Sequence, residues 1–387
     1  MDIALYGPYL FELAVGLREN PTNNVRLFLD ESSLPRSLLT EPLLHDRSFA
    51  EIGRWITRKT ILRPNSSELA KRFDDFDVAL VTELGPIIAS RSTTKFVFVP
   101  TGWDLTSAPF PVRSRSTRQR GLGDVSSALI AERQRKGILA AIDIWTSVPF
   151  APWTLAAERL GVELSNWLPQ PIDTCRFRPA RNEDHLNTGS GALRIVHPSR
   201  MMFSQDPFLI ETGQYKRNDM FVRGFSRALD QGIDARLVVV ERASSPDQVM
   251  MKEMIEDLGV SDRIEWLNAG TPAGFTWGEL ADLYRSADLV ADQFGGWFGL
   301  VSLEGAASGK PVLNCVDLDL MNSMYPNRSP FIQTTDEGDV CDAISMLTDP
   351  QVRRTIGESS RQWLLANHDR KVVTRRCESM LKELGLT

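Results

Sequence analysis

The segment Asp292-Gln-Phe-Gly-Gly-Trp-Phe-Gly-Leu-Val-Ser-Leu-Glu-Gly-Ala-Ala-Ser-Gly-Lys-Pro-Val312 joins a glycine-rich loop to an apolar helical stretch and then to a strand. Loop glycines let a backbone approach a ligand closely, and the first N–H groups of a helix attract anions. The glycines are Gly295, Gly296 and Gly299. We expect the amides of Leu300 and Val301 to face a pyrophosphate.

Glu304 lies one turn inside the predicted helix, where its carboxylate is placed to accept hydrogen bonds from a ribose diol. A carboxylate on such an apolar stretch is costly to bury unless a ligand or a side chain pairs with it. The following run to Lys310 superficially resembles a phosphate-binding loop. Its spacing is wrong, however, and Pro311 stands where a Ser or Thr would bind magnesium. We therefore reject that interpretation.

Two cations lie upstream of this segment. Arg200 follows a predicted strand, and Lys216 precedes the next predicted helix. A diphosphate leaving group gains negative charge as a glycosidic bond breaks, and fixed cations stabilise that charge without a metal. Each cation alone is more typical of a solvated loop. Their order relative to Glu304 favours one shared site.

Strands and helices alternate in both halves of the chain, which predicts an α/β fold with parallel sheets covered by helices. In the first half the predicted strands include Ile3–Tyr6, Val78–Val81, Phe96–Val99 and Ile142–Trp145. In the second half they are Leu193–His197, Ala235–Val240, Arg263–Trp266, Leu289–Ala291 and Pro311–Cys315. The predicted helices there are Asp219–Gln231, Gln248–Leu258, Trp277–Ser286, Leu300–Ser308 and an amphipathic Lys371–Leu384.

The chain has 387 residues, more than one hydrophobic core usually holds, so two domains are expected. Loop-forming residues cluster at 181–192 and predict a linker. We therefore expect an N-terminal Rossmann-like domain at 1–180, a C-terminal one at 193–370 and a terminal helix at 371–387.

Composition restricts the partners. The net charge of −6 argues against a dedicated nucleic-acid binder, and four widely spaced cysteines favour a reducing, cytoplasmic setting. The sequence contains no run of about 18 apolar residues, so no membrane-spanning helix is predicted. Seven Lys and Arg residues between Arg113 and Lys136 indicate either a solvated helix face or a surface for an anionic acceptor or a membrane, which would allow peripheral membrane contact. The pair Asp317 and Asp319 is interpreted as loop capping, so no metal is predicted.

Four ordered segments carry a resemblance to glycosyltransferase family 4, a family of retaining GT-B enzymes. They are Leu168–Pro179, which is similar to an interdomain Pro-Asn-Gly-Val-Asp and Phe-x-Pro signature, Pro198–Arg200 with Lys216, Leu258–Leu267, and Phe298–Val312. The resemblance implies two Rossmann-like domains facing a cleft, with the terminal helix packing back on the N-terminal lobe. It assigns the donor phosphates to Arg200 and Lys216 and the ribose to Glu304.

The sequence departs from the family pattern at two places. The first glutamate of the family's Glu-x7-Glu motif falls at Gly296, so Asp292 or Gln293 is expected to take over its contacts to the donor sugar. In the N-terminal half, Thr101 replaces the histidine of a His-Gly-x-Asp pattern that ends at Asp104, for which we expect a catalytic role in the cleft.

The resemblance implies transfer of a sugar from a nucleotide-diphosphate sugar to a hydroxyl of a glycan, lipid-linked or small-molecule acceptor, with no further cofactor. Such transfer needs no protein nucleophile. Two alternatives stay open: an epimerase or hydrolase with the same fold, and a catalytically silent sugar-nucleotide-binding protein.

Overall fold

The structure is a computed structural model that describes residues 1–63, 67–110, 122–164, 166–181, 191–241, 245–268 and 274–386. The chain forms two compact units. The first comprises Met1–Pro171, Glu211–Gly213 and Val373–Thr387, and the second comprises Ile172–Ile210 and Gln214–Val372. The chain thus enters the second unit before the expected 181–192 linker, of which residues 182–190 lie outside the described residues. Ile172 pairs with Asp369 in that unit.

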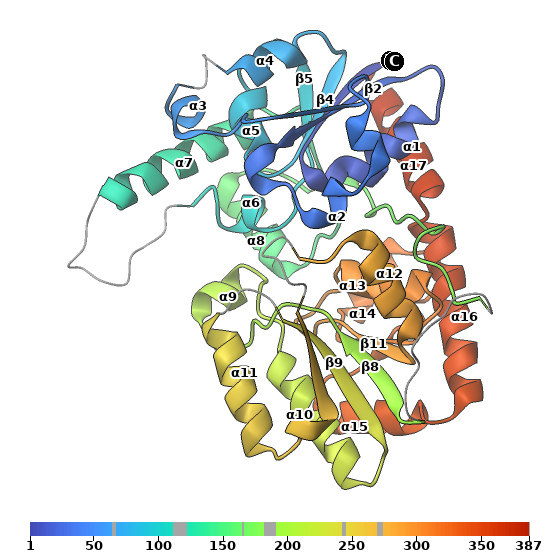
Figure 1. Ribbon diagram of the computed structural model, residues 1–387. Coiled ribbons are helices and arrows are strands. Elements are labelled where there is room, and N and C mark those ends of the chain that lie inside the picture. Colours follow the sequence, from blue (N-terminus) through green and yellow to red (C-terminus); the bar gives the residue numbers. More distant parts are fainter. Residues whose placement is uncertain are drawn as a thin grey trace. The chain divides into compact units, whose positions relative to one another are not determined.

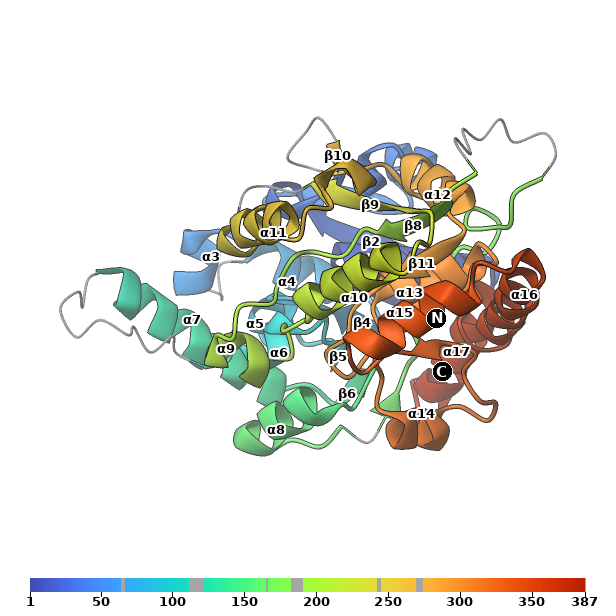
Figure 2. The same cartoon turned by 90° about the horizontal axis from the view of Figure 1, so that it is seen from below.

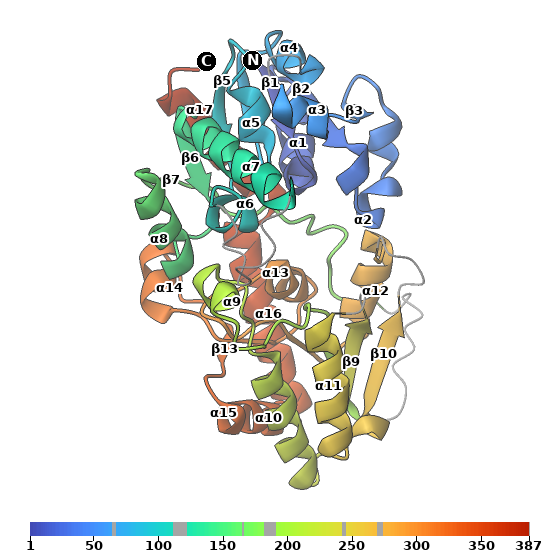
Figure 3. The same ribbon diagram turned by 90° about the vertical axis from the view of Figure 1, so that its left-hand side faces the viewer.

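The first unit contains a seven-stranded sheet in the order β3-β2-β1-β4-β5-β6-β7, in which all paired strands are parallel (Figure 1). The strands are β1 (Asp2–Tyr6), β2 (Asn24–Asp30), β3 (Ala50–Gly53), β4 (Val78–Val81), β5 (Lys95–Phe98), β6 (Asp143–Thr146) and β7 (Asn166–Trp167). The helices are α1 (Phe11–Arg18), α2 (Arg36–Leu39), α3 (Arg58–Leu62), α4 (Glu68–Phe73), α5 (Gly85–Ala89), α6 (Trp103–Thr106), α7 (Leu122–Leu139) and α8 (Ala151–Leu160). Figure 3 shows α5 and α7 side by side over this sheet.

The second unit contains a six-stranded parallel sheet in the order β10-β9-β8-β11-β12-β13. The strands are β8 (Leu193–His197), β9 (Ala235–Glu241), β10 (Ile264–Asn268), β11 (Leu289–Ala291), β12 (Val312–Asn314) and β13 (Ile332–Gln333). The helices are α10 (Asn218–Asp230), α11 (Pro246–Asp257), α12 (Trp277–Ser286), α13 (Leu300–Ala307), α14 (Leu318–Met324), α15 (Glu337–Met346) and α16 (Pro350–Asn367), with a short α9 (Pro207–Glu211) at the unit boundary. Helices α10 and α15 pack along each other (Figure 2).

The central strands are apolar along their whole length because helices cover both faces of a parallel sheet. Every residue of Val78–Val81 is at most 1% exposed, and so is each of Ile3 to Tyr6. The same holds for Leu289–Ala291 in the second unit. These short apolar runs are what made the strands readable from the sequence.

The strand order reverses once in each sheet, between β1 and β4 and between β8 and β11. In open α/β sheets a ligand binds beyond the carboxyl ends of the strands at such a point, because the loops on its two sides diverge there. The residues that directly follow the flanking strands are Gly7 and Thr82 in the first unit and Pro198 and Asp292 in the second.

The terminal helix α17 (Arg370–Glu383) contributes its residues from Val373 onward to the first unit. Asn20 and Asn23 donate to Glu378 Oε1 over 2.7 and 2.9 Å, and Arg376 Nε donates to Trp167 O over 2.8 Å. The prediction that this helix packs back on the N-terminal lobe is therefore confirmed. Among the described helices, none combines the length and the apolar character that crossing a bilayer requires.

Candidate functional site

Arg200 and Asp292 lie beyond the carboxyl ends of β8 and β11, the two strands that flank the reversal in the second sheet. Arg200 is exposed, whereas Asp292 is fully buried. The sheet thus places an exposed cation at the position where doubly wound folds bind their ligands.

Lys216 reaches the same edge although 15 residues, 201–215, separate it from Arg200. Its N–H donates to Met202 O over 2.6 Å, and its carbonyl accepts from Phe294 N over 2.9 Å. The backbone of Lys216 is therefore held between the loop that follows Arg200 and the loop that follows β11. The structure brings Arg200, Lys216 and the glycine-rich loop together.

Gly295 makes this arrangement possible. A Cβ atom at this position would lie 2.1 Å from Tyr215 O, which is far inside van der Waals contact. Only glycine lets the loop after β11 approach the backbone immediately before Lys216 so closely.

Asp292 organises the start of α13. Its Oδ2 accepts from Gly299 N at 2.6 Å, from Ser302 N at 3.3 Å and from Ser302 Oγ at 2.8 Å, while Oδ1 accepts from Ser199 Oγ at 2.7 Å. This carboxylate holds the loop, which differs from the donor-sugar contact that the sequence suggested for it. That contact stays a prediction.

The amides of Leu300 and Val301 are the first two of α13, and neither donates a hydrogen bond to another described residue. Leu300 is 37% exposed, so this helix start is open to solvent. Unpaired amides and the helix dipole together favour an anion here.

Glu304 lies on the same helix and is 7% exposed. The hydroxyl of Tyr284, on α12, donates to its Oε2 over 2.8 Å. Tyr284 in turn packs edge-on against Phe177, with ring centroids 5.9 Å apart. The sequence reasoning missed Tyr284, because nothing in the spacing of α12 indicates that its hydroxyl meets Glu304.

Gly296 stands where the family pattern has a glutamate, and its backbone conformation suits glycine. Its φ is 103°, a conformation that side-chain-bearing residues rarely adopt. Beyond the adjacent residues of the chain, no heavy atom of the described residues lies within 4 Å of the position a Cβ would take. Gln293 is half-buried and donates through Nε2 to Trp297 O over 3.2 Å, so it supports the loop from within.

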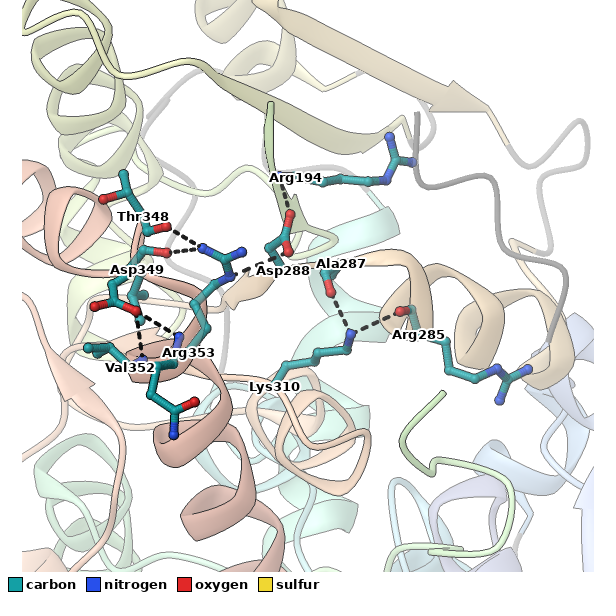
Figure 4. Close-up of polar contacts among 11 residues, drawn as sticks. Arg194, Arg285, Ala287, Asp288, Lys310, Thr348, Asp349, Val352 and Arg353 are labelled. Atoms are coloured by element: carbon teal, nitrogen blue, oxygen red, sulfur yellow. Dashed lines mark hydrogen bonds and ion pairs between the residues drawn. The ribbon is translucent and has the colours of Figure 1, made fainter. Parts of the chain in front are cut away.

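Lys310 is not a phosphate ligand. Its ammonium donates to Arg285 O over 2.9 Å and to Ala287 O over 2.5 Å at the end of α12 (Figure 4). Burial lowers the pKa of this lysine to about 8. A cation at a helix C-terminus pairs with the carbonyl groups left free there. This geometry agrees with the prediction that the run ending at Lys310 is not a phosphate-binding loop.

In the first unit the corresponding sheet edge carries Asp104, which is fully buried. Its carboxylate accepts from Thr101 N and Gly102 N at 2.9 Å each and from Glu83 N at 2.8 Å. Burial raises its pKa to about 6 despite these hydrogen bonds. Asp104 thus fixes two loops, and its predicted catalytic role stays a prediction.

Glu83 was missed by the sequence reasoning. It follows β4 with φ 54°, and Gln134 Nε2 donates to its carbonyl over 2.8 Å. Burial, together with the charges of Asp104 and Asp30, raises the pKa of its carboxyl to about 7. Asp30 itself accepts from Trp55 N and Ile56 N. In the sequence, Glu83 is marked only by its place just after the buried strand β4.

Two further predictions concern charges. Asp317 accepts from Leu320 N over 3.0 Å at the start of α14, so its interpretation as a cap is confirmed. In the described part of the chain, no group of three or more His, Cys, Asp or Glu is arranged to hold a metal. Of the basic cluster from Arg113 to Lys136, residues up to 121 lie outside the described residues, and Arg135 and Lys136 pair with Glu132.

Comparison with known proteins relates the chain to glycosyltransferases. No protein-family model matches it. The D-inositol 3-phosphate glycosyltransferase of Nocardia farcinica is 36% identical over 159 residues, which cover 38% of this chain and 31% of that protein. That of Corynebacterium glutamicum is 33% identical over 104 residues, covering 26% and 24%. The chain therefore spans only about a quarter to a third of the length of these curated relatives.

Solved structures match over the whole chain. Anabaena HepE in complex with UDP and glucose superimposes with a TM-score of 0.67 at 14% identity, covering 98% of this chain and 99% of that one. Sucrose-phosphate synthase from Thermosynechococcus elongatus gives 0.65 at 14% identity, covering 100% and 99%. The relatives and the shared architecture support the resemblance to glycosyltransferase family 4, and the chain has the two-domain GT-B fold.

Proposed function

We propose that this protein is a glycosyltransferase that takes a nucleotide-diphosphate sugar as donor. The observation that carries the proposal is the meeting of four features at one edge of the second sheet. They are the exposed Arg200, the Lys216 backbone held between two loops, the amides of Leu300 and Val301, and the carboxylate of Glu304.

Each feature matches one part of such a donor. A diphosphate requires positive charge and N–H donors, which the two cations and the start of α13 supply. A ribose diol requires an acceptor, which Glu304 supplies with one oxygen already oriented by Tyr284. Anabaena HepE, whose fold this chain shares, has been crystallised with UDP and with UDP-glucose, which supports a uridine nucleotide as the first donor to test.

We further propose that transfer is retaining and independent of metal. As the bond between sugar and diphosphate breaks, charge accumulates on the leaving phosphate, and the two cations with the α13 amides stabilise it. The departing phosphate then takes the proton of the incoming hydroxyl. That hydroxyl belongs to a glycan, a lipid-linked sugar or a small molecule, and the first unit supplies its site.

The decisive experiment measures binding of UDP-, GDP-, ADP- and dTDP-sugars by calorimetry without metal, for the wild type and for Arg200→Ala, Lys216→Ala and Glu304→Ala. We expect one nucleotide class to bind and each substitution to weaken it about tenfold or more, because each removes a charged hydrogen-bonding group. If no nucleotide sugar binds, or if affinity survives all three substitutions, the proposal is wrong.

Product analysis separates the alternatives. Incubation with the bound donor and a panel of hydroxyl acceptors gives a glycoside with the donor's anomeric configuration if the proposal holds. Release of free sugar without acceptor would instead identify a hydrolase, and an altered donor sugar an epimerase. Tight donor binding with no turnover of any kind would identify a silent binding protein, the reading that Gly296 and Thr101 motivate.

A further inference from the structure

We propose that His197 and Asn218 are positioning residues that lock Arg200 and Lys216 into the geometry for binding a diphosphate. This inference rests on the proposed function. Neither side chain belongs to the set predicted from the sequence, and both are 0% exposed.

A chain of hydrogen bonds links the sheet to the Lys216 loop. His197, the last residue of β8, contacts Ala291 O on the neighbouring β11 through Nδ1 at 2.9 Å. Its Nε2 lies 2.9 Å from Nδ2 of Asn218, the first residue of α10. Asn218 Oδ1 accepts from Met202 N at 2.9 Å, and Met202 O accepts from Lys216 N.

These contacts determine the protonation of the imidazole. A backbone carbonyl can only accept, so Nδ1 of His197 must carry the proton, and Nε2 offers a lone pair. Asn218 must then present its NH₂ to His197, which leaves its oxygen for the Met202 amide. A protonated imidazole would need the asparagine oxygen for itself, and Met202 N would lose its acceptor. The network is therefore consistent only with neutral His197.

The surroundings keep the imidazole neutral. Burial lowers the pKa of His197 to about 4, the positive charge of Lys216 acts in the same direction, and the Ala291 carbonyl and Asp292 act against it. The ring also packs against Phe221 and Phe294, with centroids 5.0 and 6.5 Å away. Near neutral pH the hydrogen-bond chain from His197 through Asn218 and Met202 to Lys216 is therefore intact.

This hydrogen-bond chain restrains the long segment between Arg200 and Lys216. The segment between Arg200 and Lys216 is long, and an unrestrained loop of this length would allow the two cations to drift apart. Met202, two residues after Arg200, bonds Lys216 through its carbonyl and Asn218, two residues after Lys216, through its N–H. These two bonds close the loop between the cations. The cations are then pre-organised before the ligand arrives, which lowers the entropic cost of binding.

The test compares His197→Phe, which keeps an aromatic ring but removes both hydrogen bonds, with His197→Gln, whose amide oxygen can still accept from Asn218. Asn218→Ala removes the side-chain contacts of Asn218 to His197 and to Met202 N. The matched control is Asn367→Ala, which removes a buried asparagine of the same unit whose Nδ2 donates to Trp363 O within α16. Calorimetry measures the affinity for UDP and, separately, for uridine, and thermal unfolding reports on the fold.

We expect His197→Phe and Asn218→Ala to weaken UDP binding about tenfold, or about 1.4 kcal/mol, and to leave uridine binding unchanged, because uridine lacks the phosphates. His197→Gln should recover part of the loss, and Asn367→Ala should bind UDP like the wild type. Equal losses for UDP and uridine, or none for either, would overturn the inference while UDP binding by the wild type still supports the proposed function. If the wild type binds no nucleoside diphosphate, both fail.

Discussion

The two sheets of this protein share the same strand order over six strands, with β7 added to the first, but different side chains lie at their carboxyl edges. At the reversal of the second sheet the loops present Arg200, Lys216 and unpaired helix amides. In the first sheet, the loops after β4 and β5 hold the carboxyl groups of the half-buried Glu83 and the buried Asp104. The fold determines where a ligand can bind, and the side chains at each edge determine what kind of ligand it is.

The difference has a chemical consequence. An anionic ligand is favoured at the second edge by cations and by the dipole of α13. The first edge disfavours anions, because it already holds carboxyl groups whose pKa values are raised to about 7 and about 6, mainly by burial. A neutral hydroxyl compound is compatible with such a site, since it can hydrogen-bond to a carboxyl group in either protonation state.

The largest effect is expected where the second edge is most tightly built. Gly295→Ala would place a Cβ 2.1 Å from Tyr215 O, so the loop carrying Lys216 must shift. Overpacking against backbone costs about 1–3 kcal/mol, and we expect UDP affinity to fall about a hundredfold. Calorimetry measures the affinity, with circular dichroism to check that the second unit stays folded.

Gly278→Ala on α12 is the matched control, because the nearest atom to its added Cβ lies 3.9 Å away. It should bind UDP like the wild type. If both alanine variants bind UDP equally well, the close approach of Gly295 to Tyr215 does not position the proposed donor site. The contrast between the two sheet edges would then not depend on this contact.

The next effect concerns the first edge and depends on pH. The pKa of Glu83 is raised from 4.5 to about 7, so the folded state binds the proton more tightly than the unfolded state. This contribution to stability is fully present below pH 4.5 and is lost as the pH rises through about 7. Glu83→Gln, which stays neutral, should be more stable than the wild type at pH 8 by about 2 kcal/mol and equally stable at pH 4.

Thermal unfolding across this pH range measures the difference. Glu163→Gln serves as control, since Glu163 is exposed and its replacement should leave the pH profile of the wild type unchanged. A Glu83→Gln variant whose stability parallels that of the wild type at every pH would show that ionisation of Glu83 does not destabilise the folded state.

The same contrast explains what the sequence could predict. Strands Leu193–His197 and Leu289–Ala291 and helix Trp277–Ser286 were predicted with their observed bounds, because short apolar runs and helical periodicity are local signals. Arg200, Lys216 and Glu304 were predicted as site residues because their order along the chain carries the resemblance. Both kinds of signal are properties of contiguous sequence.

The parts that were missed depend on contacts between distant residues. Tyr284 and Glu304 are 20 residues apart, and Asn218 meets His197 across a long loop. The hydrogen bonds that Asp292 accepts from Ser199, Gly299 and Ser302 could not be indicated by any spacing rule. Glu83 acquires its raised pKa from burial and from charges on other loops. Such properties follow only from the tertiary structure.

The smallest effect tests whether Tyr284 orients Glu304. Tyr284→Phe removes one hydroxyl that donates over 2.8 Å and keeps the ring against Phe177. Loss of one hydrogen bond to a carboxylate should weaken UDP binding about fivefold, or about 1 kcal/mol. Binding of 2′,3′-dideoxy-UDP should not change, because that analogue lacks the diol. Tyr325→Phe is the matched control: its buried hydroxyl meets His368 Nε2 at 2.9 Å in the same unit. Equal losses with both nucleotides would mean that Tyr284 supports the fold of α12 and α13 and does not act through the ribose contact.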